Sequence, residues 1–417
     1  MEFKRVVVTG LGTINPIGNS IAEFWDNLEN GVGGSGMITH FDASKFKTQF
    51  ACEVKNFVPG DHFDRKEVRK LDLYAQYALV AAKQAVEDSN LDLESEDLTK
   101  AGVIWGSGIG GIKTFLDEVT GYANGDGTPR FSPFFIPKMI SDIAAGHISM
   151  KYGFQGPNYG TVSACASASH AMIDSMNYIR LGKANIFITG GSEASINEAG
   201  LGGFNSMQAL STNNEEYKTA SRPFCNTRDG FVMGEGGGCL ILEEYEHAKK
   251  RGAKIYAEIV GGGMSGDAYH LTATHPEGRG AINAMKMALE DANMKPEDID
   301  YINVHGTSTP VGDIPETKAL QTVFGEHAYK LNISATKSMT GHLLGAAGSV
   351  EAIACILALN NQTVPPTINF SEQDPNIDER LNLTLHKAQK REIRAALSNT
   401  FGFGGHNASV IFKSFIE

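Results

Sequence analysis

Short apolar runs alternate along the chain with segments of helical periodicity. The runs are rich in β-branched residues and most of them end in glycine; they are Val6–Gly10, Val103–Gly106, Ile186–Gly190, Ile302–Gly306 and Ala408–Phe412. Uniformly apolar strands between helices are typical of a sheet that helices cover on both faces. The pattern therefore predicts an α/β fold.

Two of the helical segments are similar to each other. Ala81–Asn90 and Ala284–Asn293 lie 203 residues apart, share six of ten residues, and each leads on to a strand that closes in glycine. Chance similarity between Ala/Glu-rich helices is the alternative, but the matching order of the elements after each segment favours a duplicated α/β unit. We expect two halves, 1–250 and 251–417, that meet near the charged segment Lys249–Gly252 and share an interface.

Composition narrows the class of protein. Of 417 residues, 47 are glycine and 14 are proline, and 41% are hydrophobic, which excludes disorder and collagen and indicates many tight turns. The 36 basic and 48 acidic residues give a net charge of −12. This balance argues against nucleic acid or an anionic membrane surface as a partner.

Cysteine spacing and hydropathy give no sign of export. The five cysteines are widely spread without a CxxC pair, which fits neither a disulfide framework nor a zinc site. Met1–Arg5 and the valines that follow lack the apolar segment of a leader, and the most apolar region, Leu343–Leu359, is interrupted by Glu351. We expect a cytoplasmic protein without membrane insertion.

Gly106–Gly111 matches the GxGxxG pattern of dinucleotide sites, between a predicted strand and the helical pattern Ile112–Val119. Such a site also needs a second strand that ends in an acidic residue about 20 residues further on. Gly121–Pro129 has the composition of a loop instead. The sequence thus favours a glycine-rich turn with no cofactor.

Cys165 is the strongest candidate for a nucleophile. It lies in Tyr159–Ser169, a stretch of mostly small residues that leads into a helical pattern. A cysteine at a helix N-terminus faces free N–H groups and the positive end of the helix dipole, so we expect its pKa to fall from about 8.5 toward neutrality. An inert buried thiol is the alternative, and it is our interpretation of the other four cysteines, Cys52, Cys225, Cys239 and Cys355.

Two histidines on glycine-flanked turns are its expected partners. His305 follows a strand end in His-Gly-Thr-Ser-Thr-Pro, and His342 closes Lys-Ser-Met-Thr-Gly-His before a helix of small residues. Together with Cys165 they predict a Cys/His/His set that needs no metal. Glu351 lies mid-helix among apolar residues, where an unpaired carboxylate is costly, so Lys337 is its expected partner. A solvent-facing Glu351 is the alternative.

Near the C-terminus, Asn399–Asn407 alternates glycine with Phe401 and Phe403 just before the last strand. Glycines permit a mobile turn and bring backbone N–H groups close to a ligand. An ordinary hairpin turn is the alternative, but two phenylalanines in such a turn indicate the wall of a cavity.

Together these motifs resemble the β-ketoacyl-acyl-carrier-protein synthases, most closely the elongating type of bacterial fatty-acid synthesis. They occur in the family's order, and the resemblance covers essentially the whole chain. It implies a thiolase-like fold in which two duplicated α/β halves form five αβαβα layers, a homodimer, and no cofactor. It also implies that Cys165 takes an acyl chain from acyl carrier protein. Malonyl-carrier protein then loses CO₂ and extends that chain by two carbons.

The resemblance assigns roles to further residues. His305 and His342 would donate hydrogen bonds to the enolate oxygen, and the backbone N–H groups of Cys165 and Phe403 would hold the thioester oxyanion. Hydrogen bonds to the pantetheine arm would come from Thr307 and Thr309. The residues that match positions lining or gating the acyl pocket are Ile109, Phe204, Phe401 and Phe403, with Asp267–His270 as a second mobile loop.

An acidic carrier protein needs a basic surface despite the net charge of this chain. The densest basic cluster is Arg65–Lys70, whose cations are Arg65, Lys66, Arg69 and Lys70. Spacing of i, i+4 places two of them on one helix face. A solvated charged helix is the alternative; the resemblance favours carrier docking there, aided by Arg130.

Two residues depart from the family pattern. Cys225 stands where an aspartate is usual, which removes a carboxylate, and His406 stands where threonine is common, which adds a titratable group beside the gate. Neither touches the Cys/His/His set.

Several related classes of protein share this fold. Chain-initiating synthases use Cys/His/Asn, and catalytically silent subunits that set chain length lack the cysteine, so the three residues found here disfavour both. A thiolase on the same fold is the other rival enzyme, and the intact set also disfavours a pure carrier-binding module. A polyketide synthase domain shares all three residues and stays open.

Overall fold

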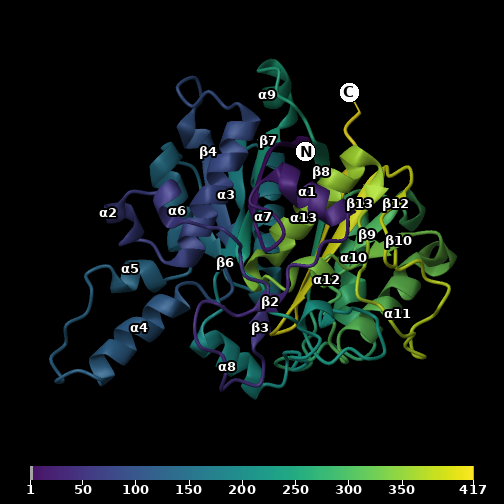
Figure 1. Ribbon diagram of the computed structural model, residues 1–417. Coiled ribbons are helices and arrows are strands. Elements are labelled where there is room, and N and C mark those ends of the chain that lie inside the picture. The colour runs from purple at the N-terminus through teal and green to yellow at the C-terminus, as the bar shows by residue number, and fades with distance from the viewer. Residues whose placement is uncertain (1–2, 417) are drawn as a thin grey trace.

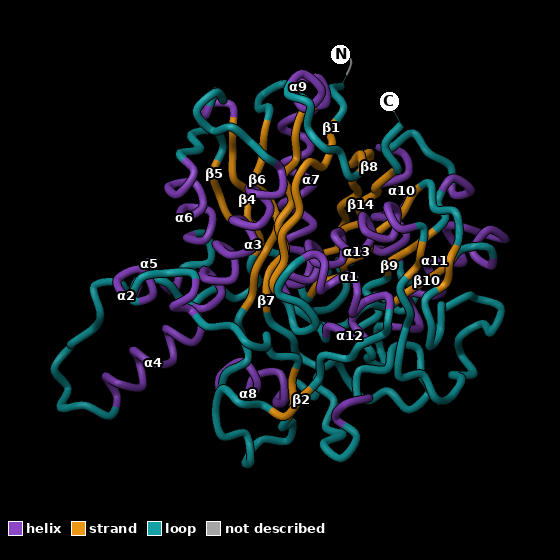
Figure 2. The backbone as a smooth tube through the Cα atoms, turned by 45° about the horizontal axis from the view of Figure 1, so that its top comes forward, coloured by secondary structure: helices purple, strands orange, loops and turns teal. Residues whose placement is uncertain are grey.

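The computed structural model describes residues 3–416, so Met1 and Glu2 of the expected leaderless N-terminus lie outside the described residues. Ten strands form one mixed sheet in the order β10-β9-β13-β14-β8-β1-β7-β6-β4-β5 (Figures 1 and 2). Their bounds are β1 Val6–Ile14, β4 Ala101–Gly106, β5 Asn158–Thr161, β6 Ile186–Glu193, β7 Gly236–Glu244, β8 Ala257–Gly266, β9 Tyr301–Asn303, β10 Asn332–Ser334, β13 Ala395–Gly402 and β14 His406–Lys413. Two short antiparallel pairs are β2 Gly36–Met37 with β3 Phe50–Ala51, and β11 Thr363–Val364 with β12 Gln389–Lys390.

The large sheet consists of two five-stranded parts with the same topology. In chain order, the strands of each part lie as first, fifth, fourth, second and third, counted outward from the centre. The parts join where β1 pairs with β8, through only two residue pairs, Val7 with Glu258 and Val8 with Ala257. The repeated order confirms the duplicated α/β unit. The domain boundary at residue 250 stays a prediction.

Helices complete five layers. Outer helices α3 (Leu73–Ser89) and α10 (Arg279–Asp291), which contain most of the two similar segments, cover opposite faces of the molecule. Between the two parts of the sheet lie α7 (Ser167–Arg180) and α13 (Ala347–Asn361), which contact each other and strands of both parts (Figure 2). The layers therefore run helix, sheet, helix, sheet, helix.

The remaining helices surround this core. They are α1 Ile21–Glu29, α2 Arg65–Val68, α4 Ile112–Ala123, α5 Phe135–Met139, α6 Ile143–Tyr152, α8 Glu198–Ser206, α9 Tyr245–Lys250, α11 Asp313–Phe324 and α12 Lys337–Thr340. The GxGxxG turn leads directly into α4, and α4 with α5 forms an arm that extends from the body (Figure 1). The composition of Gly121–Pro129 predicts a loop. This prediction is confirmed from Asn124 onward and is wrong for Gly121–Ala123, which belong to the end of α4.

The central layer is the most apolar part of the molecule. Residues of α13 are buried on every side from Ala347 to Leu359, and the largest apolar cluster joins this helix to α7 and to β1, β7 and β14. The segment Leu344–Asn361 is long and apolar enough to cross a membrane by length and composition alone, but 89% of it is buried inside the molecule. It packs here as the core helix that an all-round apolar surface predicts.

Candidate active site

Cys165 lies on a sharp turn between strand β5 and helix α7. The turn is a single 3₁₀ segment, Ala164–Ala166, whose first residue has a left-handed φ of 50°. Ser167 fixes it from the helix side, because its Oγ accepts from the backbone N–H of Ser163 (2.9 Å) and donates to the carbonyl of Ala164 (2.7 Å). The predicted placement of the thiol at the start of a helix is therefore confirmed.

The expected fall in the pKa of Cys165 is wrong. Burial raises the pKa of this thiol to about 12, although Lys337 and a backbone hydrogen bond from Phe403 act in the opposite direction. Removal of the thiolate from water outweighs these two influences. The resting thiol is protonated, so a neighbouring base has to accept its proton.

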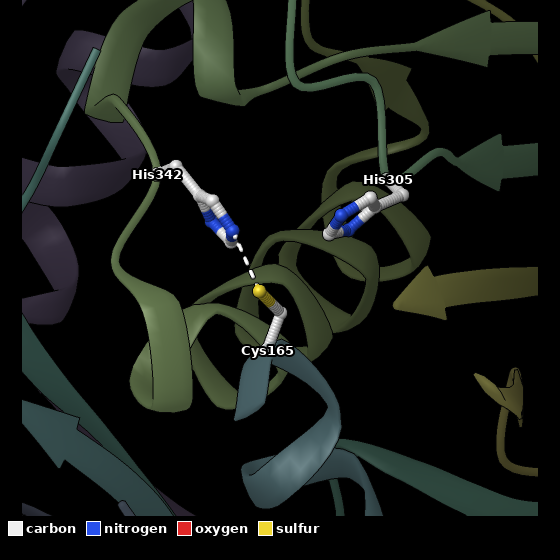
Figure 3. Close-up of side chains that lie close together, drawn as sticks. All are labelled: Cys165, His305 and His342. Carbon is white, nitrogen blue, oxygen red and sulfur yellow. Dashed lines mark hydrogen bonds between the residues drawn. The ribbon is translucent and has the colours of Figure 1, made fainter. Parts of the chain in front are cut away.

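His342 is that neighbour. Its Nε2 lies 2.9 Å from Cys165 Sγ (Figure 3). The backbone of His342 is held on both sides by an extended segment, since its N–H donates to Val232 (2.7 Å) and its carbonyl accepts from Gly234 (2.9 Å). Phe231 packs edge-on against the imidazole, with ring centroids 5.3 Å apart.

His305 completes the group from the turn that follows β9. Its ring lies perpendicular to that of His342, with centroids 5.3 Å apart at 89°, and Figure 3 shows the two rings on the same side of the sulfur. Glu316 of α11 anchors the turn, because its two oxygens accept from the N–H groups of His305 (2.7 Å) and Gly306 (2.8 Å). The Cys/His/His set predicted from widely separated motifs is one cluster.

Both imidazoles are neutral at ordinary pH. Burial, followed by the charge of Lys337, lowers the pKa of His305 and of His342 well below the usual value. Among the described residues, none hydrogen-bonds the buried Nδ1 atom of either ring. Each ring can therefore present an N–H or a lone pair at Nε2, which suits a group that donates in one step and accepts a proton in another.

Lys337 and Glu351 form the expected pair. The Lys337 ammonium donates to Glu351 Oε1, and the two side chains are almost completely buried. Burial raises the pKa of Glu351 to about 7 while Lys337 lowers it. The alternative of a solvent-facing Glu351 is wrong. The pair does not line the cavity, and its ammonium acts on Cys165 and both histidines through its charge.

A cavity of about 550 Å³ opens over the sulfur. The predicted site residues that line it are Ile109, Cys165, Phe204, His305, Thr307, Thr309, His342, Phe401 and Phe403. The hydroxyls of Thr307 and Thr309 lie 3.1 Å apart on its wall. Of the candidates for catalysis and substrate binding, only Lys337 and Glu351 stand behind the wall.

The glycine–phenylalanine motif is both a hairpin turn and a cavity wall. It joins β13 to β14, where Gly402 pairs with His406. Two backbone hydrogen bonds fasten it to the loop after β8: Asp267 N–H donates to Gly405 (3.0 Å) and Gly404 N–H donates to Leu271 (2.8 Å). The two segments expected to gate the entrance are thus in direct contact.

The two departures from the family pattern lie outside the reacting group. Cys225 is fully buried; burial raises its pKa, but hydrogen bonds with Ser371 and Thr227 lower it to about 7. These thiol contacts, at 3.4 and 3.2 Å, supply polar support in place of a carboxylate. His406 is exposed, and its imidazole lies against Gly404 of the hairpin turn.

The predicted docking cations are exposed. Helix α2 is a single turn, Arg65–Val68, and is shorter than a full docking helix. It contains Arg65 and Lys66, and Arg69 and Lys70 follow it directly. Lys70 Nζ lies 5.9 Å from the ring of Phe134, close to α5. Arg130, on the loop between α4 and α5, pairs with Asp126 at 3.3 Å.

The site also offers ligands of the zinc type. One atom each from Cys165, His305 and His342 lies within 4.8 Å of the other two. Thiolate and imidazole are the ligands zinc prefers. The same three groups can also act as nucleophile, proton acceptor and hydrogen-bond donors without an ion.

Sequence reasoning missed the buried carboxylates around the site. Glu316 anchors His305, and Glu193 accepts hydrogen bonds from two different turns. A usable signal for Glu193 was its position three residues after the apolar run Ile186–Gly190, where a charged residue at a strand end needs partners. Phe231 carried no signal, because its edge-on contact depends on a chain crossing that the sequence does not display.

Comparisons with known proteins match the whole chain. Residues 3–248 match the family model "Beta-ketoacyl synthase, N-terminal domain", and residues 256–371 match "Beta-ketoacyl synthase, C-terminal domain". The chain is 48% identical over 415 residues to 3-oxoacyl-[acyl-carrier-protein] synthase 2 of Staphylococcus aureus (strain COL), covering 99% of both. It is 46% identical over 413 residues to the protein of that name from Coxiella burnetii (strain RSA 493), again covering 99% of both.

Solved structures agree with this. A beta-ketoacyl synthase from Burkholderia phymatum superposes with a TM-score of 0.91 at 34% identity, covering 99% of this chain and all of the other. A type II polyketide ketosynthase solved with its acyl-carrier protein gives a TM-score of 0.89 at 34% identity over 99% of this chain and all of the other.

Proposed function

The chain belongs to the beta-ketoacyl synthases, and on that premise we propose that it extends carrier-bound acyl chains by decarboxylating condensation with malonyl-acyl carrier protein. The observation that carries the proposal is the 2.9 Å contact between Cys165 Sγ and His342 Nε2, faced by His305 under the cavity. We assign the reaction to fatty-acid elongation, because the chain is 46–48% identical to the two 3-oxoacyl-[acyl-carrier-protein] synthases 2 and 34% identical to the polyketide ketosynthase.

The first half-reaction moves the acyl chain to Cys165. The thiol gives its proton to His342 Nε2 as the sulfur attacks the thioester carbonyl, and the carrier's pantetheine thiolate leaves and takes a proton. The thiol is protonated at rest, so this contact supplies the nucleophile only when substrate is in place. The tetrahedral oxygen is held by the backbone N–H groups of Cys165 and Phe403, and each donor lowers the barrier by about 3 kcal/mol.

The second half-reaction forms the carbon–carbon bond. Malonyl-carrier protein loses CO₂, and the electron pair left behind forms an enolate whose oxygen accepts from Nε2–H of His305 and His342. The enolate carbon then attacks the Cys165 thioester, and the cysteine sulfur leaves and recovers a proton. His305 is neutral and donates from Nε2–H without first having to gain a proton, whereas His342 donates the proton that its Nε2 took from Cys165 in the first half-reaction.

The cavity supports the assignment of binding roles. Thr307 and Thr309 stand on its wall at a spacing suited to two hydrogen bonds along a pantetheine arm. Ile109 borders both this cavity and a second hollow whose wall is largely apolar, formed with Ile112, Phe115, Met139 and Val162. A long acyl chain bound to Cys165 would continue past Ile109 into that hollow.

The carrier protein is expected at the exposed cations Arg65, Lys66, Arg69 and Lys70, with Arg130 on the neighbouring arm. An acidic partner and a basic strip attract each other across solvent and so raise the rate of encounter. This docking surface, and the cytoplasm as the compartment in which such a carrier occurs, remain parts of the proposal.

We also propose a homodimer that pairs along β5. This strand lies at one edge of the sheet, and Val162 just beyond it is 61% exposed. Several large apolar side chains of the adjoining arm are exposed as well: Phe115, Val119, Tyr122, Phe131, Phe134 and Ile136. An unpaired edge beside a large apolar surface indicates a protein interface. Sedimentation analysis of the wild type and of Val162→Asp tests it; a monomeric wild type would contradict the dimer.

The experiment that tests the reaction is elongation with malonyl-carrier protein and acyl-carrier proteins of graded length. The expected results are a 3-oxoacyl product longer by two carbons and an acyl adduct on Cys165 by intact-mass analysis. The graded lengths also report the depth of the cavity. Absence of an adduct at Cys165 while product still forms would refute the nucleophile.

A further inference from the structure

A buried carboxylate that the reaction does not use lies between the two halves of the site. Glu193 is the last residue of β6, and its side chain has no contact with solvent. Its partners are one hydroxyl and four backbone N–H groups: Ser107 Oγ (3.2 Å), Ile109 (3.2 Å) and Gly110 (3.3 Å) donate to Oε1, and Gly108 (2.8 Å) and Gly345 (3.0 Å) donate to Oε2.

These donors belong to two turns that are remote in sequence. Ser107–Gly110 follows β4 and carries Ile109 on the cavity wall. Gly345 lies three residues after His342, in the 3₁₀ segment Leu344–Ala346 that begins the approach to α13. One carboxylate therefore joins the turn of the acyl pocket to the turn of the histidine.

Two glycines allow this close approach. A Cβ added to Gly345 would lie 2.2 Å from the backbone nitrogen of Gly108 and 2.7 Å from Glu193 Oε2. A Cβ on Gly108 would lie 2.9 Å from the same oxygen. The backbone nitrogen of Gly108 cannot yield at such a distance, so the close approach that the carboxylate bridges requires glycine at position 345.

The donor set requires an acceptor with two oxygens. An ionised carboxylate accepts at both, whereas a glutamine would direct an N–H₂ at backbone N–H groups. Burial raises the pKa of Glu193 to about 7, and the hydrogen bonds from Gly108, Gly345, Ile109 and Ser107 lower it. The titratable groups that feel its charge are Tyr74 of α3 and Cys165.

We propose that Glu193 is a positioning residue of the condensation, which fastens the turn of Ile109 to the turn of His342. In this role it keeps His342 Nε2 at the sulfur and Ile109 at the wall of the acyl cavity. The inference rests on the proposed function and adds to it a residue that acts only through others.

The cysteine turn is held independently of Glu193. Ser167 fastens Ser163 and Ala164 from the helix side. Loss of Glu193 should therefore disturb the histidine more than the nucleophile. Both half-reactions are expected to slow through His342, because decarboxylation uses it as a donor and transfer of the acyl chain uses it to accept the proton of Cys165.

The test measures the two half-reactions separately in Glu193→Gln. Decarboxylation of malonyl-carrier protein is expected to fall about tenfold or more, because hydrogen bonds to a buried charged group are lost. Transfer from acyl-carrier protein to Cys165, followed by intact mass, is expected to fall as well, because the contact that takes up the proton of the thiol is disturbed, whereas the KM for each carrier-bound substrate should change less than about threefold. The preference among acyl lengths should also become flatter as Ile109 is released.

Two further variants keep the inference open to refutation. Ser107→Ala removes one donor and is expected to lower both half-reactions by about twofold, even if Glu193→Gln does not fold. Glu243→Gln is the matched control, because Glu243 is fully buried and bonded to Thr9, His247 and Arg251. It should lower stability and leave both half-reactions unchanged.

Unchanged half-reactions in Glu193→Gln and Ser107→Ala, or an equal loss of activity in Glu193→Gln and Glu243→Gln, would overturn the inference. A wild-type chain that shows neither half-reaction would contradict the proposed function instead. In that case the positioning role of Glu193 is tested by the rate of alkylation of Cys165. This rate should change in Glu193→Gln if the contact between His342 and Cys165 depends on Glu193. An unchanged rate would refute the positioning role.

Discussion

The turn that carries Cys165 and the turn that carries Gly345 have the same backbone and different chemistry. Ala164 and Leu344 have left-handed φ angles of 50° and 51°, and each begins a three-residue 3₁₀ segment that leads into a helix of the central layer. At the second position stands a nucleophile in one turn and a glycine in the other. Duplication preserved the bend and left only one copy reactive.

The comparison extends to the neighbouring positions. Two residues before each bend lie Val162, which is 61% exposed, and His342, which is 3% exposed. The turns after β4 and β9 both donate backbone N–H groups to a buried carboxylate, Gly108 to Glu193 in the first and His305 to Glu316 in the second. One half supplies the nucleophile and the other supplies both histidines, so neither half is a catalyst alone.

The largest effect is expected from removing the one reactive bend. Cys165→Ala should lower condensation about 10⁴-fold or more, since no other group can hold the acyl chain. Elongation assays and intact mass check this result. An acyl adduct that persists in the variant would place the nucleophile elsewhere and end the contrast between the two turns.

The histidines of the other half come next. His305→Ala and His342→Ala should each lower decarboxylation about 100- to 1,000-fold, because each removes a donor to the enolate oxygen. Release of CO₂ from malonyl-carrier protein is the measurement. If only one variant loses activity, the other histidine is not a donor to the enolate.

Adding a side chain at Gly345, in the turn without a nucleophile, tests why this position is glycine. Gly345→Ala places a Cβ against Gly108 and should cost about 1–3 kcal/mol of unfolding free energy by overpacking. Urea denaturation measures it. Gly203→Ala in α8 is the control, because a Cβ there meets nothing within 4 Å, and it should stabilise by about 0.5–1 kcal/mol. Equal midpoints for the two variants would contradict the close approach of the turns.

The raised pKa of the reactive thiol predicts a steep pH dependence. A thiol with a pKa of about 12 is neutral at pH 7, so alkylation of Cys165 in the free protein should rise about tenfold per pH unit from 7 to 9. Mass spectrometry of the modified peptide measures the rate. A plateau below pH 8 would instead show a thiolate stabilised by the helix end or by His342.

The smallest effect on activity is expected at the exposed cations next to α2, which lie in the same half of the molecule as Cys165. Arg69→Glu with Lys70→Glu should raise the apparent KM for carrier-bound substrate about threefold to tenfold at low salt, and less at high salt. The exposed pair Lys249→Glu with Lys250→Glu in α9 makes the same change of charge at a distant end of the molecule. The docking surface is refuted if both double variants behave alike.

Much of this site could be predicted from sequence, because its parts stand on local signals. Cys165, His305 and His342 each lie on a turn that glycine or small residues announce, and Lys337 with Glu351 follows from the cost of an unpaired buried carboxylate. The similarity between Ala81–Asn90 and Ala284–Asn293 predicted the duplicated α/β unit. Local sequence signals are therefore sufficient to identify functional residues at strand ends and helix starts.

The remainder depends on contacts across the fold. The pKa of Cys165 is governed by burial from elements that pack over the helix end, so the local inference from helix position had the wrong sign. The partners of Glu193 come from two turns, one before it and one more than a hundred residues after it, and no periodicity reveals such a meeting. The length of α2 was likewise shorter than its charge pattern suggests.

The position of α13 has a consequence for how the chain is made. This helix covers the inner face of strands that leave the ribosome long before it does, because β6 and β7 are complete by residue 244 and α13 ends at residue 361. Until then β6 and β7 lack the part of their inner cover that α13 provides beside α7, and exposed apolar strands favour aggregation. We therefore expect nascent chains arrested before α13 to bind a chaperone, and chains arrested after Phe412 to release it.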